Sequence, residues 1–241
     1  LRRMGLSVHL VGKHDRMLYH DFDEELSSQL ETLFRSNGVK LYFSEGEQQV
    51  EGEPGAYSIR LNRSRVQVAG ELLAYAIGLE PRLELPRRAG LDCDQGICVD
   101  GGLRTSHRDI YAAGDVAQHP SGRVTHLWRH AMHQGQCAGE NAVRALAEEP
   151  ERDYRYVPFR EKCKVFGRYF FSLGVPPSEE LGAYVLHRYE RDDWLIRAYV
   201  QDGAVHGVSM IDDMEREKEY ATAVLEQWPL ERFAEHFGLE P

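Results

Sequence analysis

The chain has 241 residues, with 29 Lys and Arg against 39 Asp and Glu, and a formal net charge of −10. This acidic balance argues against nucleic-acid binding, because clustered basic side chains are needed to neutralise phosphates. Hydrophobic residues make up 42% of the chain, which is enough for a packed core. No apolar run approaches the roughly 20 residues that span a bilayer, and no signal-peptide pattern is present, so a cytoplasmic location is expected.

The four cysteines match neither zinc-ligand spacing nor a redox Cys-x-x-Cys motif. Cys93 and Cys98 flank a predicted turn, which leaves a disulfide between them open, but free thiols are expected in a reducing compartment. The first residue is Leu1 rather than Met, and we therefore expect the chain to begin inside a longer fold.

The start of the chain shows the order of elements expected of a parallel α/β sheet. Residues 1–5 are typical of a helix end, and residues 7–11 of a strand. A helix is predicted over 23–36, with Asp23 as its N-cap and leucines at helical spacing. Residues 39–43 are the next predicted strand.

The middle of the chain mixes two patterns. Glycine and proline punctuate residues 45–70, which predicts a small antiparallel meander with strands at 57–61 and 65–68. The nearly continuous apolar run at 71–78 predicts a buried central strand of a parallel sheet. Further predicted elements are strands at 97–99 and 109–113, a helix over 126–147 and a charged linker at 148–153.

Beyond the linker, the pattern changes to antiparallel strands followed by two helices. Asp202-Gly203 predicts a tight hairpin turn. The predicted strands are 162–166, 169–172, 182–189, 194–201 and 204–211, and the predicted helices are 213–227 and 230–237. The sequence therefore predicts an α/β part up to about residue 150 and an α+β part after it.

The most specific segment is Thr105-Ser-His-Arg-Asp-Ile-Tyr-Ala-Ala-Gly-Asp-Val-Ala117. It resembles the second FAD fingerprint of the FAD-dependent pyridine nucleotide oxidoreductases, in which a strand ends in Gly-Asp and the carboxylate binds a ribityl hydroxyl. Ligands of open α/β sheets bind at such strand ends, and glycine lets the backbone approach a cofactor. The alternative is an ordinary strand followed by an Asp turn.

Three further segments resemble the same family in its order. Residues 71–82 resemble the strand that leaves the NAD domain, 90–100 the hairpin before the fingerprint, and 126–135 the start of a helix beside the flavin. The resemblance implies no proton-transfer residue. It implies FAD contacts from Gly114, Asp115, Val116, Trp128, Ala131, Gln134 and Gly135, and NAD(P) contacts from Gly12, Lys13, Ile77 and Gly78.

The resemblance also implies a domain organisation. The start of the chain resembles an NAD domain just after its Gly-x-Gly-x-x-Gly loop, so both glycine-rich loops of the family lie outside this sequence. The implied fold is α/β, with partial Rossmann-like NAD- and FAD-binding units and a smaller α+β domain. The implied boundaries are 1–80 for the rear of the NAD(P) domain, 81–150 for the end of the FAD domain and 151–241 for a flavin-covering and dimerisation domain.

One departure from the family concerns the choice of nicotinamide cofactor. The strand end that binds the adenosine ribose is usually acidic, whereas Gly12 stands here, followed by Lys13, His14 and, after Asp15, Arg16. Nearby positive charge suits a 2′-phosphate, so NADPH is an option beside NADH, and a solvated basic turn is the alternative.

The segment at residues 163–174 resembles the start of the C-terminal domain of nitrite-reductase-type flavoproteins. Rubredoxin and ferredoxin reductases share the architecture of these flavoproteins. The implied function is an FAD-dependent oxidoreductase that passes electrons from NAD(P)H through the flavin to an unidentified acceptor protein or domain, as a homodimer. The chain alone is expected to be inactive and to hold FAD weakly. The alternative function is non-catalytic: an interaction or dimerisation module, or a degenerate flavoprotein fragment.

Two other groups of polar residues have competing interpretations. His126, His130 and His133 fall on one face of the predicted helix, which leaves a metal site open, but a wall of the flavin pocket without metal is expected. The acidic pairs Glu179-Glu180 and Asp212-Asp213 lie at turns or helix starts, where the helix dipole favours carboxylates. No catalysis is expected from them.

Overall fold

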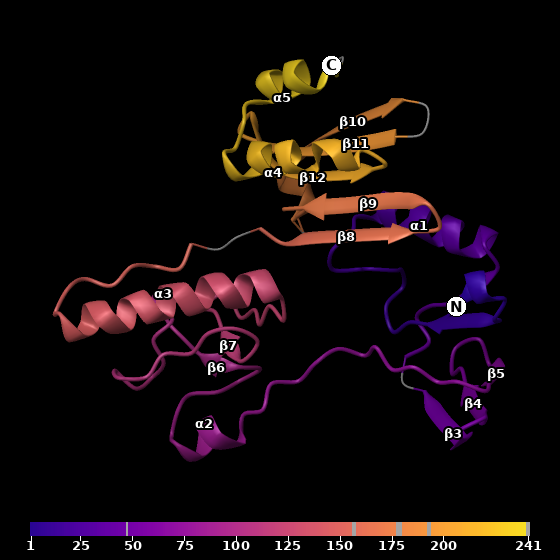
Figure 1. The fold of residues 1–241 in the computed structure, drawn as a ribbon, viewed down its shortest axis with the longest axis horizontal. Coiled ribbons are helices and arrows are strands. Elements are labelled where there is room, and N and C mark those ends of the chain that lie inside the picture. Colours follow the sequence, from indigo (N-terminus) through magenta and orange to yellow (C-terminus); the bar gives the residue numbers. More distant parts are fainter. Residues whose placement is uncertain (47, 156–157, 177–179, 192–193, 240–241) are drawn as a thin grey trace. The chain divides into compact units, whose positions relative to one another are not determined.

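The protein is described by a computed structural model, in which contacts divide the chain into two compact units (Figure 1). The first unit combines residues 1–74 with 158–241, and the second contains residues 75–157. The structure thus joins the first and last of the three predicted domains in one unit, and the family boundaries stay a prediction. The described residues are 1–46, 48–155, 158–176, 180–191 and 194–239.

A parallel strand pair with its connecting helix opens the first unit, as predicted. Gly5 ends a turn of 3-10 helix in the left-handed conformation, with φ of 82°. Asp23 caps the following α-helix by accepting a hydrogen bond from the Leu26 N–H at 2.9 Å. The elements are η1 (Arg2–Met4), β1 (Val8–Val11), α1 (Glu24–Ser36) and β2 (Val39–Tyr42); β1 and β2 pair in parallel.

A five-stranded antiparallel sheet forms the other part of this unit, in the order β10-β11-β12-β9-β8. All five strands were predicted from the sequence. Asp202 and Gly203 both have positive φ, 52° and 77°, which matches the right-handed twist of the β11–β12 hairpin. The strands are β8 (Arg160–Val165), β9 (Arg168–Leu173), β10 (Val185–Arg191), β11 (Trp194–Gln201) and β12 (Ala204–Ile211), with η2 (Leu181–Ala183) before β10.

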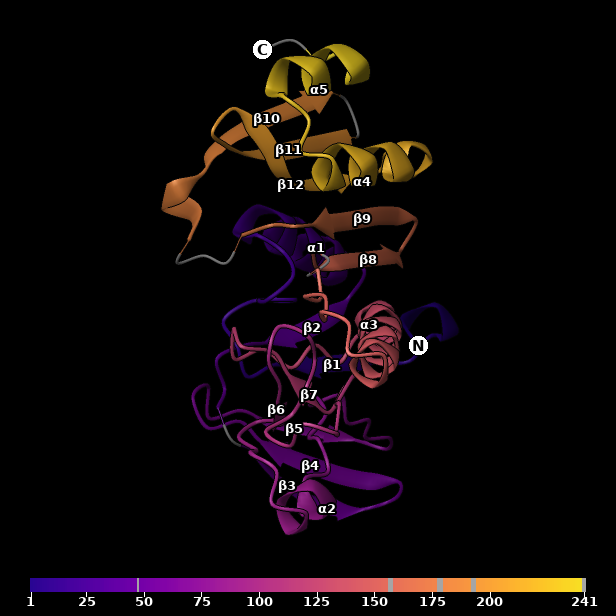
Figure 2. The ribbon, with the colours of Figure 1, turned by 90° about the vertical axis from the view of Figure 1, so that its left-hand side faces the viewer.

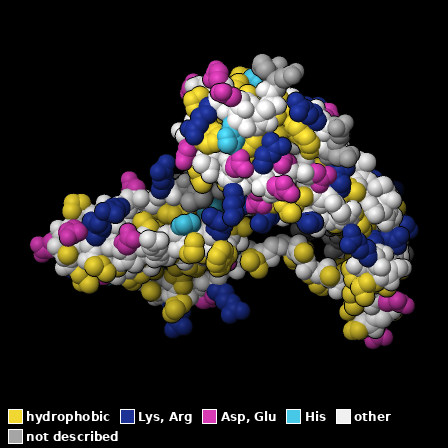
Figure 3. All heavy atoms as spheres, turned by 45° about the horizontal axis from the view of Figure 1, so that its top comes forward, with side chains coloured by type: hydrophobic (Ala, Val, Ile, Leu, Met, Phe, Trp, Pro, Cys, Tyr) yellow, Lys and Arg dark blue, Asp and Glu magenta, His cyan; other side chains and the backbone are white. Residues whose placement is uncertain are grey.

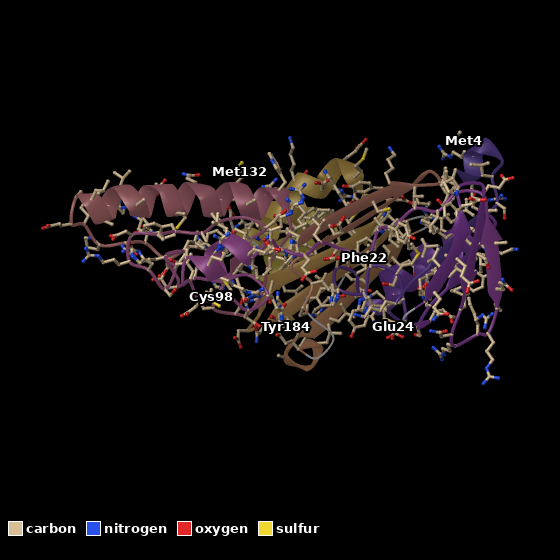
Figure 4. All side chains as sticks on the ribbon, turned by 90° about the horizontal axis from the view of Figure 1, so that it is seen from below. Met4, Phe22, Glu24, Cys98, Met132 and Tyr184 are labelled. Carbon is tan, nitrogen blue, oxygen red and sulfur yellow. The ribbon has the colours of Figure 1, made fainter. Side chains whose placement is uncertain are left out.

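Helices cover both faces of this sheet (Figures 1 and 2). On one face, buried residues such as Phe171 and Met210 pack with Tyr220 and Phe233 of the terminal helices. On the other, Phe170 packs with Phe22 and the leucines of α1; Phe22 is labelled in Figure 4. Neighbouring strand residues point to opposite faces, so the run of aromatics in β9 feeds two cores. The terminal elements are η3 (Met214–Arg216), α4 (Glu217–Leu225) and α5 (Leu230–Phe237).

The predicted meander is present with one more strand than expected. Its strands are β3 (Gln49–Glu53), β4 (Ala56–Arg60) and β5 (Gln67–Gly70), paired in that order. The predicted strand at 71–78 is wrong: this segment is extended but belongs to no sheet of the described chain, and Leu72 and Ile77 are 77% and 89% exposed. A strand needs a partner for its backbone groups, and none of the described strands pairs with this segment.

The second unit is built around one long helix. The predicted helix is confirmed as α3 (Trp128–Leu146), which begins two residues later than expected. The predicted strand at 109–113 is wrong, because Tyr111 alone forms a single bridge, to Arg104. Isolated backbone hydrogen bonds between loops take the place of continuous strand pairing in this segment. The remaining elements are α2 (Glu84–Arg88), β6 (Ile97–Cys98) and β7 (Ala117–Gln118), with β6 and β7 paired in parallel.

Three features concern the chain as a whole. All four cysteines are free thiols, as expected. No helix within the described ranges has the length and apolarity needed to cross a bilayer. Basic and acidic side chains are interspersed on the face drawn in Figure 3.

Candidate functional site

The Gly114-Asp115 turn lies directly against α3. Gly114 is buried and has a φ of 81°, in the left-handed region that favours glycine. Its N–H donates a hydrogen bond to the Gln134 side-chain oxygen at 2.7 Å. A Cβ atom at position 114 would come within 3.3 Å of the Ala131 Cβ. The structure therefore brings together three of the predicted FAD residues, and explains why each of them is small or able to accept a hydrogen bond.

Asp115 presents an exposed carboxylate at this turn. Within the part of the chain that the structure describes, its side chain forms no hydrogen bond or ion pair. The turn itself is fixed, because the Ala117 N–H donates to the Gly114 carbonyl at 3.0 Å and the Ile97 N–H donates to the Val116 carbonyl at 2.7 Å. A rigid turn thus holds an acceptor that is available to a ligand hydroxyl.

The N-terminus of α3 adds a second polar feature. Its N-cap, Leu127, is extended and supplies no side-chain hydrogen bond, so the first N–H groups of the helix have no partner of the helix's own. The partial positive charge of a helix N-terminus favours electron-rich ligands. Trp128, at the first helical position, is 76% exposed. Gly135 is also exposed, and a Cβ there would meet nothing within 4 Å, so local packing does not require this glycine.

A buried hydrogen-bond network, which was not predicted from the sequence, supports the Gly114-Asp115 turn. Gln118 is buried; its side-chain oxygen accepts from the Gly96 N–H at 3.0 Å and its amide donates to Asp94 at 3.0 Å. A Cβ at position 96 would come within 2.8 Å of the Val116 carbonyl oxygen. Gly96 therefore lets the two loops approach, and its spacing of 22 residues from Gln118 gives no local sequence signal.

A second missed residue, Asn141 of α3, joins three segments of the unit. Its amide donates to the carbonyls of Gly102 and Arg152, each at 2.8 Å, and its oxygen accepts from the Arg152 N–H at 2.9 Å. Nearby, Glu151 accepts hydrogen bonds from Tyr111 and Arg104. These contacts hold the loop before the fingerprint and the segment after α3 on the same helix.

The three histidines do not share a helix face. His126 precedes α3 and has a φ of 47°. His130 is 2% exposed, and its Nδ1 lies 3.3 Å from the Tyr154 hydroxyl. Burial lowers the pKa of His130, and nearby His133 and Arg129 lower it further. Over the described ranges, no group of three His, Cys, Asp or Glu residues could hold a metal ion.

The predicted NAD(P) residues are divided between the two units. Gly12 and Lys13 follow β1 in the first unit, where the Gly12 N–H donates to the Tyr42 carbonyl at 2.8 Å. Ile77 and Gly78 belong to the second unit, and both are exposed. The predicted FAD residues, in contrast, all belong to the second unit.

The acidic pair Asp212-Asp213 has structural contacts. Asp212 pairs with Arg168 and accepts from the Tyr169 N–H at 2.6 Å. Asp213 accepts from the Tyr220 hydroxyl at 2.5 Å and pairs with Arg216 at 3.0 Å. The other predicted acidic pair, at positions 179 and 180, includes a residue outside the described ranges.

Comparison with curated proteins shows related chains that are much longer. The chain is 38% identical over 116 residues to the nitric oxide reductase FlRd-NAD(+) reductase of Citrobacter koseri, an alignment that covers 48% of this chain and 30% of the relative. It is 33% identical over 119 residues to the benzene 1,2-dioxygenase system ferredoxin–NAD(+) reductase subunit of Pseudomonas putida, covering 49% and 29%. The chain thus matches less than a third of these curated relatives.

Solved structures share the fold. Reduced CoADR-RHD of Bacillus anthracis superposes with a TM-score of 0.81 at 20% identity, covering 100% of this chain and 46% of that one. The NAD-dependent persulfide reductase of A. fulgidus superposes with a TM-score of 0.77 at 22% identity, covering 97% and 47%. Both solved chains are about twice as long as the part that superposes.

The family model described as pyridine nucleotide-disulphide oxidoreductase matches residues 1–135, more than half of the chain. That range contains the parallel strand pair, the Gly114-Asp115 turn and the start of α3. The chain belongs to the pyridine nucleotide-disulphide oxidoreductase family.

Proposed function

We propose that this chain is part of an FAD-dependent oxidoreductase that takes electrons from NAD(P)H and passes them to a separate acceptor. The observation that carries the proposal is the rigid Gly114-Asp115 turn, held on α3 by Gln134 and presenting an exposed carboxylate. The residues fit a flavin, because a hydroxyl-bearing chain needs such an acceptor at a strand end, and Gly114 lets the turn pack directly against Ala131 of α3.

Each residue of the site has a distinct proposed role. Asp115 accepts a hydrogen bond from a ribityl hydroxyl, and Gly114 and Val116 supply backbone beside the cofactor. The N-terminus of α3, with Trp128 at its first position, stabilises electron density on the ring system. When bound, FAD supplies the redox chemistry, and the protein supplies position and electrostatics.

Titration of the purified chain with FAD, followed by visible absorption and flavin fluorescence, tests this proposal. We expect weak but saturable binding, measured as a change in flavin fluorescence and a shift of the flavin band at about 450 nm. Asp115→Ala should weaken binding about tenfold, because it removes one charge-assisted hydrogen bond. Asp109→Ala, another exposed aspartate of the same segment, is the matched control. A chain that ignores FAD, or an Asp115→Ala variant that binds as well as the control, would contradict the proposed site.

The acceptor is proposed to be a small redox protein. The two curated relatives are named as reductases of FlRd and of a ferredoxin. Reduction of a ferredoxin or a rubredoxin-type protein by the assembled enzyme, followed by the absorbance change of the acceptor, tests this. Oxidation of NAD(P)H that proceeds at the same rate with and without either protein would contradict it.

One observation favours the second candidate, a dimerisation module. The outward side of α3 is apolar, with Trp128, Met132, Val143 and Leu146 exposed, and the first of these is also a proposed flavin neighbour. We propose that a second copy of the chain covers this side. Val143→Lys would place a charge in that interface. Light scattering should show a dimer for the unsubstituted chain and a monomer for Val143→Lys. An unsubstituted chain that is monomeric would contradict the homodimer.

A further inference from the structure

His130 lies in the first turn of α3, on the side of the helix that holds the Gly114-Asp115 turn. It is 2% exposed, and Gln134, four residues later, is 1% exposed. Residues four apart are neighbours on one face of a helix, and Gln134 is the residue that accepts a hydrogen bond from the Gly114 N–H at 2.7 Å. Ala131, which follows His130 in sequence, is the residue against which Gly114 packs. A shift of His130 would therefore displace both residues that contact Gly114.

A second route connects His130 to the turn through the segment that follows α3. The His130 Nδ1 lies 3.3 Å from the Tyr154 hydroxyl, and it accepts the hydroxyl proton when the proton of the neutral imidazole is on Nε2. The Tyr154 N–H donates to the Gly101 carbonyl at 2.7 Å, and the Tyr154 ring packs edge-on against His119, with centroids 6.2 Å apart. His119 directly follows β7, and β7 follows the Gly114-Asp115 turn after one residue.

A positive charge on His130 is unfavourable at this position for several reasons. His130 is the third residue of α3, where the partial positive charge of the helix N-terminus opposes a cation. Burial lowers the pKa of His130, and nearby His133 and Arg129 of the same helix lower it further. Protonation also converts Nδ1 from an acceptor into a donor, so the Tyr154 hydroxyl can no longer donate to it. The packing of α3 on the turn therefore requires the neutral imidazole.

We propose that His130 is a positioning residue whose neutral imidazole holds the start of α3 against the Gly114-Asp115 turn, so that acidification loosens the turn and lowers the affinity for FAD. This inference rests on the proposed function, because it adds a pH-dependent control to the same flavin site. His130 acts through Gln134 and Ala131, which contact Gly114, and through Tyr154, which joins the start of α3 to the loop after β7.

The first test needs no flavin. Amide hydrogen exchange followed by NMR on the full chain would give the protection factor of the Gly114 N–H between pH 7.5 and 5.0, corrected for the intrinsic pH dependence of exchange. We expect acidification to reduce this protection about fivefold or more, with the same midpoint as the titration of the His130 ring in the same samples. His130→Gln should remove the pH dependence. His119→Gln, which removes the other histidine that packs near Tyr154, should retain it, and circular dichroism would check that both variants fold.

FAD titration at the two ends of this pH range is the second test. The dissociation constant should rise about fivefold or more on acidification for the unsubstituted chain and stay constant for His130→Gln. Gly114 protection that is independent of pH, or that follows the titration of His119, would overturn the proposal. The midpoint comparison uses the unsubstituted chain, so it decides the matter even where His130→Gln does not fold. A chain that binds FAD equally at both pH values contradicts this inference alone, whereas a chain that binds no FAD at pH 7.5 contradicts the proposed flavin site.

Discussion

At the scale of single residues, buried polar side chains determine how the helices and strands are arranged more than exposed polar side chains do. Asp23 is 6% exposed; it caps α1 and also accepts hydrogen bonds from Ser209 at 2.8 Å, from Tyr199 and from Arg197. Burial, and then the Asp23 carboxylate, raises the pKa of Tyr199, so its hydroxyl keeps the proton that it donates. Sequence reasoning found Asp23 as an N-cap, but its partners lie more than 170 residues away and could not be predicted.

Replacing Asp23 by alanine should be strongly destabilising. The change removes the cap and leaves Arg197 in the core with fewer partners, which costs about 3 kcal/mol. Urea unfolding would measure the free energy. Glu24→Ala, an exposed acid one residue later, should change it by less than about 0.5 kcal/mol. Equal losses of unfolding free energy in the two variants would show that the buried contacts of Asp23 add nothing to stability.

Gly114 is the residue of the candidate site whose local geometry is most demanding. Alanine there must adopt a φ of 81° and approach Ala131 to 3.3 Å. We expect Gly114→Ala to cost roughly 1–2 kcal/mol and to weaken FAD binding together with stability. Gly122→Ala, with a φ of 82° but open space around it, carries the backbone strain alone. A larger loss for Gly122→Ala than for Gly114→Ala in thermal unfolding would contradict the packing argument.

At the scale of elements, the sequence was most informative where local pattern and tertiary context agree. Strand alternation and the Asp202-Gly203 turn predicted the C-terminal sheet, because a hairpin finds its partner within a few residues. The run at 71–78 was predicted wrongly: its apolar composition indicated a buried strand, whereas the described chain supplies no neighbouring strand and leaves Leu72 and Ile77 exposed. The fingerprint at 105–117 was recognised as a motif, yet its Tyr111 segment forms a single bridge rather than a strand.

The loops of the second unit depend on α3 through one side chain. Asn141→Ala would remove three hydrogen bonds, to Gly102 and Arg152, and leave the buried Gly102 carbonyl without its Asn141 donor. This should cost about 2–3 kcal/mol and increase amide hydrogen exchange in residues 100–104 and 151–154. Glu140→Ala, exposed on the same helix, is the control. Unchanged protection of those loops in Asn141→Ala would mean that other contacts hold them.

At the scale of the whole molecule, histidine burial links stability to pH. Burial is the main reason why the pKa values of His9, His119 and His130 all lie below the ordinary 6.5. As pH falls through 6.5, the unfolded chain therefore takes up protons before the folded chain does, and the free energy of unfolding decreases. Stability contributed by these histidines is present above pH 6.5 and is lost toward their folded pKa values.

Thermal unfolding measured between pH 7.5 and 5.5 would test this dependence. We expect the melting temperature to fall with pH, and the fall to be smaller in His130→Gln, which removes a buried histidine without adding a charge. His107→Gln removes an exposed histidine and should retain the full pH dependence of the parent chain. The carboxyls of Asp21 and Glu161, whose pKa values burial raises, act in the opposite sense, because they add stability as pH falls from their folded pKa values toward their unfolded values of about 4. A melting temperature that is constant or rises on acidification would show that buried histidines do not control the pH response.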